Sequence, residues 1–442
     1  MPSSSPSPSP SPFTITEHVI EAQHIREYPH ATRTGNDALK LVVKQYTPKS
    51  NPNPRPGDLT LIGTHGSGFP KELYEPMWEE LHTKLSKYGL RIRSIWIADT
   101  ANQASSGILN AEILGNDPSW NDHARDLLYM INQFKAEMPR PIVGIGHSMG
   151  AGQLTLLSLL HPRLFTSLIL LDPVMGRDIN RCMGPIFVKL SLARRDTWSS
   201  REEAEEYFRK KFKKWDPRVL ERWMNYGLRE LDTCGEDEEE AAGSSTAVTL
   251  ATSPDQEVVQ YLRPNFENKK QLSSAGDRGD VSSDSASDHD ATFHPDIIGS
   301  AHLIFPFYRA EPLVAWKLLK HVRPSVLYLF GGRSPVSRAE SRAEKIERTG
   351  RGIGGSGGYK LGKVKEVVIP GAGHHLPFEE VSSASDEMVE WVREVMRRFG
   401  EEEERIARGW VDASRQRRTS VAAEWNGYVE EALKTCRKGA KL

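Results

Sequence analysis

A Gly-x-Ser-x-Gly sequence follows a short apolar run, and its five residues are Gly146, His147, Ser148, Met149 and Gly150. The apolar residues before it predict a buried strand, and the leucine-rich residues after it predict a helix. Small residues on either side of a serine let strand and helix pass closely, so that a strained turn presents the hydroxyl. Ser148 is therefore the candidate nucleophile, and Gly146, His147 and Gly150 support the turn.

The same turn has two other interpretations. A chain of 442 residues contains Gly-x-Ser-x-Gly by chance about 0.2 times at ordinary residue frequencies. A dinucleotide-binding turn also joins a strand to a helix, but Gly144, Gly146 and Gly150 are spaced one residue too far apart for it. The apolar strand and helix patterns around Ser148 favour the catalytic interpretation.

A second glycine-containing loop, His65-Gly66-Ser67-Gly68, follows the apolar residues 59–62. The tetrahedral intermediate of acyl transfer needs backbone N–H donors, and glycines let the backbone come close. One donor comes from a loop of this kind and the other from the residue after the nucleophile. We expect the N–H groups of Ser67 and Met149 to form this oxyanion hole, with Gly68 as the next candidate. His65 would orient the loop; an ordinary strand-to-loop turn is the alternative.

A general base is expected on a loop after the last strand. The predicted strand 365–370 runs into Gly371-Ala372-Gly373, which His374 and His375 follow. We assign His374 as the base. A structural loop histidine or a metal-binding pair is the alternative, but no other His or Cys stands at ligand spacing. No metal and no cofactor are therefore expected.

Asp172 ends another apolar run, residues 167–171. Catalytic side chains gather at the carboxyl ends of the strands in an open parallel sheet. We therefore expect Asp172 to hold the ring of His374. In the alternative interpretation Asp172-Pro173 only caps a strand, because Asp is favoured before Pro in turns.

The apolar segments alternate between strand and helix patterns, as a mostly parallel sheet flanked by helices requires. Strands are expected over residues 13–22, 39–46, 59–62, 92–98, 142–145, 167–174, 325–332 and 365–370, and helices over residues 72–88, 122–134, 153–160 and 311–321. Residues 176–320 interrupt this alternation and predict an inserted, mainly helical cap.

These patterns predict how the chain is divided. We expect a disordered Ser/Pro extension over residues 1–12, the core over residues 13–175 and 321–400, the cap over residues 176–320, disordered acidic segments near residues 235–246 and 273–292, and a helical tail over residues 401–442. Within the cap, the basic run from Arg209 to Lys214 suits either a phosphorylated substrate group or a solvated helix face, and we expect the solvated face.

The composition argues against several classes of protein. The formal net charge of −1 gives no overall attraction to nucleic acid or anionic lipid. The three cysteines are far apart, and their odd number suits a reducing compartment better than a disulfide framework. No apolar run reaches the length of a membrane span, and the Ser/Pro start lacks the apolar core of a secretory signal. We expect neither a nucleic-acid partner nor a transmembrane segment.

With Ser148, Asp172 and His374 in this order, the chain resembles the α/β-hydrolase fold over residues 13–400. More closely, the sequences HGSGFPKELY at residue 65 and LDPV at residue 171 resemble fungal peroxisomal hydrolases. That group contains a host-selective-toxin biosynthesis protein and the yeast peroxisomal lipase. Many members carry the acid after the strand that here ends at Phe330, where this sequence has Ser334 instead. Pancreatic-type lipases place the acid where this chain has Asp172.

The resemblance implies a serine hydrolase that cleaves a lipid-like or acyl-CoA-like ester or thioester through an acyl-enzyme on Ser148. This activity would belong to peroxisomal lipid or secondary-metabolite metabolism. A catalytically silent hydrolase-like binding protein and a C–C bond hydrolase of the same fold are the alternatives. The chain ends in Ala440, Lys441 and Leu442, a variant of the Ser-Lys-Leu peroxisomal address. We therefore expect a peroxisomal import receptor as partner and a peroxisomal rather than a cytoplasmic location.

Overall fold

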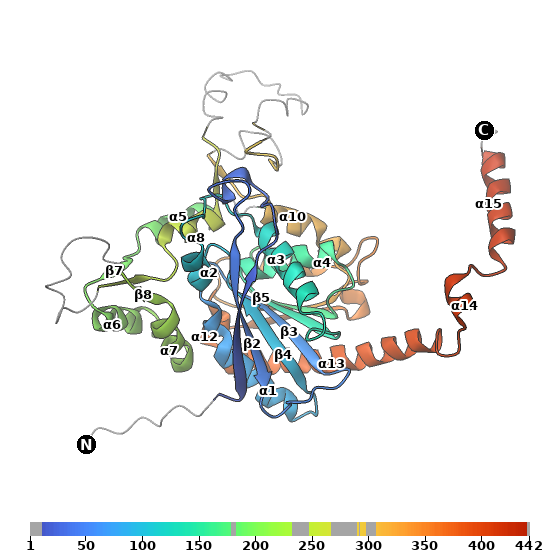
Figure 1. Ribbon diagram of the computed structural model, residues 1–442, viewed down its shortest axis with the longest axis horizontal. Coiled ribbons are helices and arrows are strands. Elements are labelled where there is room, and N and C mark those ends of the chain that lie inside the picture. Colours follow the sequence, from blue (N-terminus) through green and yellow to red (C-terminus); the bar gives the residue numbers. More distant parts are fainter. Residues whose placement is uncertain are drawn as a thin grey trace. The chain divides into compact units, whose positions relative to one another are not determined.

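The computed structural model describes residues 11–177, 183–231, 247–266, 290, 292–297 and 306–439 (Figure 1). Residues 1–10, the predicted acidic segments 235–246 and 273–289, and the terminal residues 440–442 lie outside the described residues. The chain divides into two units, Met1–Arg393 and Glu394–Leu442.

The first unit is built on an eight-stranded sheet in the order β1-β2-β4-β3-β5-β6-β12-β13. Its strands are β1 (Phe13–Glu21), β2 (Lys40–Pro48), β3 (Leu59–Thr64), β4 (Ile92–Ala98), β5 (Ile142–His147), β6 (Ser167–Leu171), β12 (Ser325–Gly331) and β13 (Val364–Ile369). β2 pairs antiparallel with β1 and with β4, and the other neighbours pair parallel. The expected mostly parallel sheet is confirmed.

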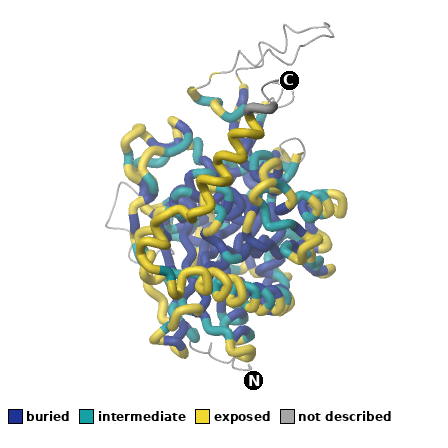
Figure 2. The backbone as a smooth tube through the Cα atoms, turned by 90° about the vertical axis from the view of Figure 1, so that its right-hand side faces the viewer, coloured by how far each residue is buried: buried dark blue, intermediate teal, exposed yellow. Residues whose placement is uncertain are grey.

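The middle of this sheet is buried (Figure 2). Every residue of β3, β5, β6 and β12 is buried, as expected of parallel strands that helices cover on both faces. The helices and turns of the sheet domain are η1 (Pro29–Ala31), η2 (Lys71–Tyr74), α1 (Glu75–Ser86), α2 (Ala104–Leu109), α3 (Trp120–Gln133), α4 (Met149–Leu160), α10 (Glu311–Leu318), η5 (Leu319–His321), α11 (Ala339–Arg348), η6 (Tyr359–Leu361) and α12 (Leu376–Glu379).

Two of the differences from the predicted element boundaries have a clear structural cause. The helix expected from residue 72 begins as the 3₁₀ turn η2, and α1 follows only at Glu75, with Pro76 in its first turn. Proline is common in the first turn of a helix, because the backbone N–H that it lacks would have no acceptor there. The strand expected to reach residue 174 ends at Leu171, because Asp172 has a φ of 44° and leaves the extended conformation.

Between β6 and α10, the described chain forms four helices and two small sheets. The helices are α5 (Gly184–Leu192), α6 (Arg201–Lys211), α7 (Pro217–Tyr226) and α8 (Pro254–Tyr261). The first sheet has the order β7-β9-β8, with β7 (Thr197–Trp198), β8 (Leu228–Glu230) and β9 (Val248–Leu250). The second consists of β10 (Arg263–Pro264) paired with β11 (Phe307–Tyr308). Ser200, Asp216 and Ser253 each accept a backbone hydrogen bond that caps α6, α7 and α8.

Helix α13 (Val381–Arg408) starts in the first unit. The second unit holds the end of α13 and the helices α14 (Arg415–Thr419) and α15 (Trp425–Gly439). None of the helices within the described ranges is long and apolar enough to cross a membrane.

Candidate active site

Ser148 lies at the sharp turn between β5 and α4. Its φ of 55° and ψ of −116° are strained for a residue with a side chain. A Cβ atom on Gly146 would lie 2.8 Å from Cα of Ala151, and one on Gly150 would lie 2.6 Å from the carbonyl oxygen of His65. Only glycine fits at these two positions, because strand, helix and loop pass closer than any side chain allows. The turn therefore has the geometry of a nucleophile elbow.

The structure brings together Ser148, His374 and Asp172. Oγ of Ser148 lies 2.9 Å from Nε2 of His374, and Nδ1 of His374 lies 2.6 Å from Oδ2 of Asp172. His374 follows β13 and Asp172 follows β6, so the carboxyl ends of different strands carry the three side chains. A serine, an imidazole and a carboxylate hydrogen-bonded in series can activate a hydroxyl for nucleophilic attack.

Asp172 is completely buried and hydrogen-bonded on both oxygens. Oδ1 accepts the N–H of Gly331 at 3.2 Å, and Oδ2 accepts the hydroxyl of Ser334 besides the ring of His374. Burial acts to raise the pKa of Asp172, but the hydrogen bonds from His374 and Ser334 outweigh it, so the pKa lies below its usual value. The carboxylate is therefore held in the charged form that an imidazolium needs beside it.

Ser67 and Met149 line the same pocket as Ser148. Met149 is the first residue of α4, where a backbone N–H has no acceptor inside the helix. Neither N–H donates to a protein group among the residues that the structure describes. The N–H of Gly68, in contrast, donates to Oε1 of Gln103 at 2.9 Å, so Ser67 is better placed than Gly68 to offer a free donor.

The side chain of Gln103 forms hydrogen bonds with Ser67 and Gly68 in the loop after β3. Its side-chain amide accepts from Gly68 and donates to Oγ of Ser67 at 3.1 Å. The same amide also donates to the carbonyl of Gln256 in α8, at 3.3 Å. One side chain thus connects the candidate oxyanion loop to the inserted helices, a contact that nothing in the spacing of the sequence indicates.

His65 is buried and acts within its own loop. Its Nε2 accepts the N–H of Thr100 at 2.8 Å, so Nδ1 carries the proton and donates to the carbonyl of Gly66 at 2.9 Å. Burial lowers its pKa and keeps the ring neutral. This geometry suits a residue that orients the loop.

Tyr74 and His147 form a hydrogen-bonded chain behind the site. The hydroxyl of Tyr74 accepts the N–H of Gly66 at 2.9 Å and donates to Nδ1 of His147 at 2.8 Å. Nε2 of His147 donates to the backbone carbonyl of His374 at 2.9 Å. Burial lowers the pKa of His147 well below its usual value, so the ring stays neutral. Through these two side chains, the loops that carry Ser67, Ser148 and His374 are fixed to one another.

His375 does not join the Ser148–His374–Asp172 arrangement. Its Nδ1 accepts from the indole of Trp215 at 3.2 Å, and burial lowers its pKa to about 3. It therefore forms a neutral part of the pocket wall.

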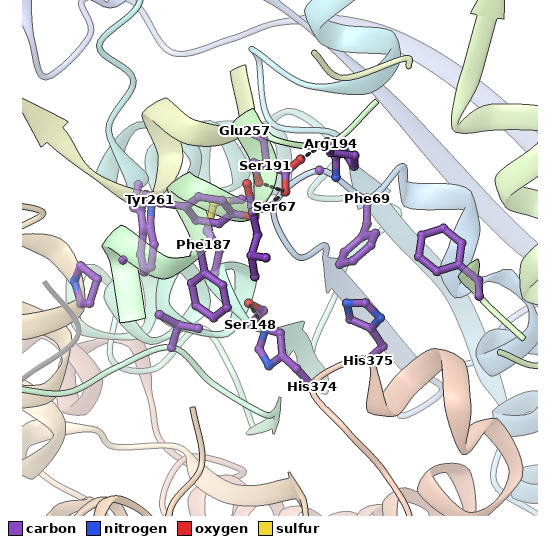
Figure 3. A pocket seen from close by; sticks show the side chains of 18 of the residues that line it. Ser67, Phe69, Ser148, Phe187, Ser191, Arg194, Glu257, Tyr261, His374 and His375 are labelled. Carbon is purple, nitrogen blue, oxygen red and sulfur yellow. Dashed lines mark hydrogen bonds and ion pairs between the residues drawn. The ribbon is translucent and has the colours of Figure 1, made fainter. Parts of the chain in front are cut away.

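A pocket of about 360 Å³ opens at Ser148 and His374. Apolar side chains dominate its walls, and they are Phe69, Trp120, Met149, Val174, Phe187, Leu190, Phe212, Trp223 and Tyr261. Figure 3 shows Ser148 and His374 at one end, with Glu257 and Arg194 at the other. Glu257 accepts from Ser191 at 3.0 Å, from Tyr261 at 2.6 Å and from Arg194. Within the described part of the chain, no three His, Cys, Asp or Glu side chains are grouped as a metal site requires.

Comparisons with known proteins agree with this geometry. Residues 61–391 match the alpha/beta hydrolase family. The type I acyl-CoA thioesterase mpaH' of Penicillium brevicompactum is 41% identical over 97% of this chain and 97% of its own length. The abhydrolase domain-containing protein ACTT2-2 of Alternaria alternata is 28% identical over 67% of this chain and 100% of its own length.

A solved structure also has a fold similar to that of this chain. The peroxisomal alpha-beta-hydrolase Lpx1 of Saccharomyces cerevisiae is similar over 98% of this chain and 99% of its own, with a TM-score of 0.62 and 18% identity. The resemblance that the sequence motifs indicated is confirmed. This chain is a hydrolytic enzyme, and it belongs to the alpha/beta hydrolase family.

Proposed function

We propose that this chain is a serine thioesterase that hydrolyses acyl-CoA, with Ser148 as nucleophile, His374 as general base and Asp172 as the acid that holds the imidazole. The observation that carries the proposal is the 2.9 Å hydrogen bond from Ser148 to His374, whose other nitrogen lies 2.6 Å from Asp172. A base within hydrogen-bonding reach of a strained, pocket-facing serine is what nucleophilic acyl transfer needs.

The reaction follows from these positions. Oγ of Ser148 attacks the thioester carbonyl carbon while its proton passes to Nε2 of His374. The N–H groups of Ser67 and Met149 donate to the developing oxyanion. The C–S bond then breaks, and the leaving sulfur takes the proton from His374. Water, deprotonated by the same ring, then attacks the acyl carbonyl, and Oγ of Ser148 takes this proton back from His374 as the carboxylic acid leaves.

Two observations support a thioester substrate with an apolar acyl group. The pocket walls are mainly apolar, which suits an acyl chain or another apolar acyl group. The relatives in Penicillium brevicompactum and Penicillium roqueforti that match over most of their length are named type I acyl-CoA thioesterases.

The test combines labelling with turnover. A fluorophosphonate probe should label the wild type but not Ser148→Ala, and release of CoA from acyl-CoA esters of graded chain length should be lost in the same variant. His374→Ala should lose activity by about 10⁴-fold or more, whereas the neighbouring substitution His375→Ala should cost far less. A wild type that is neither labelled nor active would identify a catalytically silent binding protein instead.

The proposed location is the peroxisome, reached through an import receptor that reads Ala440, Lys441 and Leu442. The yeast hydrolase of similar fold is itself named as peroxisomal. A fluorescent protein fused to the N-terminus should give a punctate signal, and one residue added after Leu442 should make the signal diffuse. A diffuse signal from the unmodified chain would contradict the proposal.

A further inference from the structure

The basic run from Arg209 to Lys214 at the end of α6 contains two kinds of side chain. Arg209 and Lys210 are exposed and pair with glutamates one turn earlier, at 3.2 Å and 2.7 Å. Lys211, Lys213 and Lys214 form no ion pair with any residue that the structure describes. The solvated helix face expected from the sequence therefore explains Arg209 and Lys210. It does not explain the three unpaired lysines.

Lys211 lines the catalytic pocket together with Ser148 and His374. It is also exposed, so it lies where the pocket opens to solvent. Its amine lies 5.4 Å from the ring centre of Tyr207 and 5.8 Å from those of Phe208 and Phe212. Although the residue as a whole is exposed, these rings partly desolvate its amine, and this desolvation, together with the charge of Arg194, lowers the pKa of Lys211 to about 8. An anionic partner would stabilise the charged form of the amine.

Arg194 provides a second cation in the same pocket. One of its nitrogens binds Glu257, but its Nε is buried and has no partner among the described residues. Arg194 and Lys211 come from different parts of the inserted segment, after α5 and at the end of α6. Both side chains line the same pocket, and most of the other residues that line it are apolar.

An acyl-CoA has its charge at the end far from the thioester. The acyl chain and the thioester are uncharged, whereas the nucleotide part carries phosphate groups. We propose that Lys211 and Arg194 form a phosphate-binding site for the CoA part of the substrate at the mouth of the catalytic pocket. This inference rests on the proposed acyl-CoA thioesterase function. Lysine binds phosphate as a compact charge and arginine through its planar group.

A second basic pocket in the described chain fits this role less well. It is lined by Arg177, Lys320, Arg348 and Arg351 but includes neither Ser148 nor His374. Two of its guanidinium groups are already paired, Arg177 with Glu344 and Arg351 with Glu347. Arg194 is likewise paired, with Glu257, so the absence of Ser148 and His374 from the lining of the second pocket is what decides against it.

The experiment compares two thioesters of the same acyl group: acyl-CoA, and S-acyl-N-acetylcysteamine, which has no phosphate. In Lys211→Met, kcat/KM for acyl-CoA should fall about tenfold more than kcat/KM for the truncated thioester, as expected for loss of one charge-assisted contact. Lys210→Met is the matched control, because its amine already pairs with Glu206 and is not among the residues that line the pocket.

Binding of CoA itself gives a readout that does not depend on turnover. By calorimetry, the Kd of CoA should rise about tenfold in Lys211→Met and little in Lys210→Met. Added salt should weaken binding to the wild type more than to Lys211→Met, because phosphate contacts are screened. Calorimetric binding therefore separates failure of the phosphate site from failure of the proposed thioesterase function.

Three results would overturn the inference. The first is an equal loss of activity towards both thioesters in Lys211→Met, which would place this lysine in the acyl-binding or catalytic machinery. The second is unchanged binding and turnover of the CoA compounds in that variant. The third is a tenfold loss of CoA affinity in Lys320→Met instead, which would move the phosphate site to the second basic pocket.

Discussion

Ser334 donates its hydroxyl hydrogen bond to the carboxylate of Asp172, although 162 residues separate them in the chain. Ser334 stands after β12, where many related hydrolases carry the acid, whereas Asp172 follows β6. The pairing is possible because β6 and β12 are parallel neighbours in the sheet, so their carboxyl ends lie side by side. The serine after β12 thus acts as a hydrogen-bond donor to the carboxylate after β6.

Ser334→Ala should lower kcat/KM for acyl-CoA by about tenfold, because a hydrogen bond to a charged group contributes roughly 1.5–3 kcal/mol. The loss of this donor should also raise the pKa of Asp172, whose hydrogen bonds now hold it down. Steady-state hydrolysis checks this variant, with circular dichroism to show that it folds. An unchanged kcat/KM would contradict the role of Ser334.

Asp172→Asn should fold normally yet lose about 10⁴-fold in kcat, since the amide would favour the wrong tautomer of the histidine ring. Glu340→Gln is the control, because Glu340 lies in the first turn of α11. This helix follows β12 and Ser334, in the part of the chain where many related hydrolases carry the acid. Steady-state hydrolysis and circular dichroism check the two variants. Near-normal turnover in Asp172→Asn, with loss in Glu340→Gln, would assign the acid to the segment after β12 instead.

Tyr74→Phe should remove the hydrogen-bonded link between the loop that carries Ser67 and the turn that carries Ser148. The N–H of Gly66 and Nδ1 of His147 would both lose their partner in a buried site. Leaving buried groups unpaired costs about 1–3 kcal/mol each, and we expect kcat to fall about tenfold or more, because small misplacements of catalytic groups are costly.

Tyr328→Phe is the matched control for this substitution. Tyr328 is also buried, and its hydroxyl bonds to Thr349 at 2.7 Å, away from the catalytic loops. Both variants should lower the melting temperature, but only Tyr74→Phe should lower kcat strongly. Equal effects of the two variants on kcat would show that the Tyr74 hydroxyl has only a structural role.

The preference for acyl-CoA over S-acyl-N-acetylcysteamine should decrease at alkaline pH. Lys211 binds phosphate only while protonated, and its pKa is lowered to about 8. The ratio of the two kcat/KM values should therefore fall above this pH, by about tenfold in all, which is the differential loss expected for Lys211→Met. His375 does not titrate in this range, because its pKa is about 3. A ratio that is independent of pH in the wild type, or a pH dependence that persists in Lys211→Met, would contradict the prediction.

The sequence by itself determined the features that depend on local patterns. The apolar runs and their spacing predicted the strands of the sheet, and the glycines around Ser148 predicted its turn, because strand burial and tight turns restrict residue types directly. The order of Ser148, Asp172 and His374 also indicated the family before any distance between them was known. These inferences require no knowledge of which segments meet.

Only the tertiary structure decided which distant side chains share one site. The partners of Tyr74, Gln103 and Ser334 could not be read from the sequence, because strand order or a loop crossing brings each partner to its side chain. Lys210 and Lys211 are identical neighbours in the sequence, yet Lys211 lines the pocket while Lys210 pairs with a glutamate. Helix rotation and packing set this difference, because residues next to each other on a helix point about 100° apart.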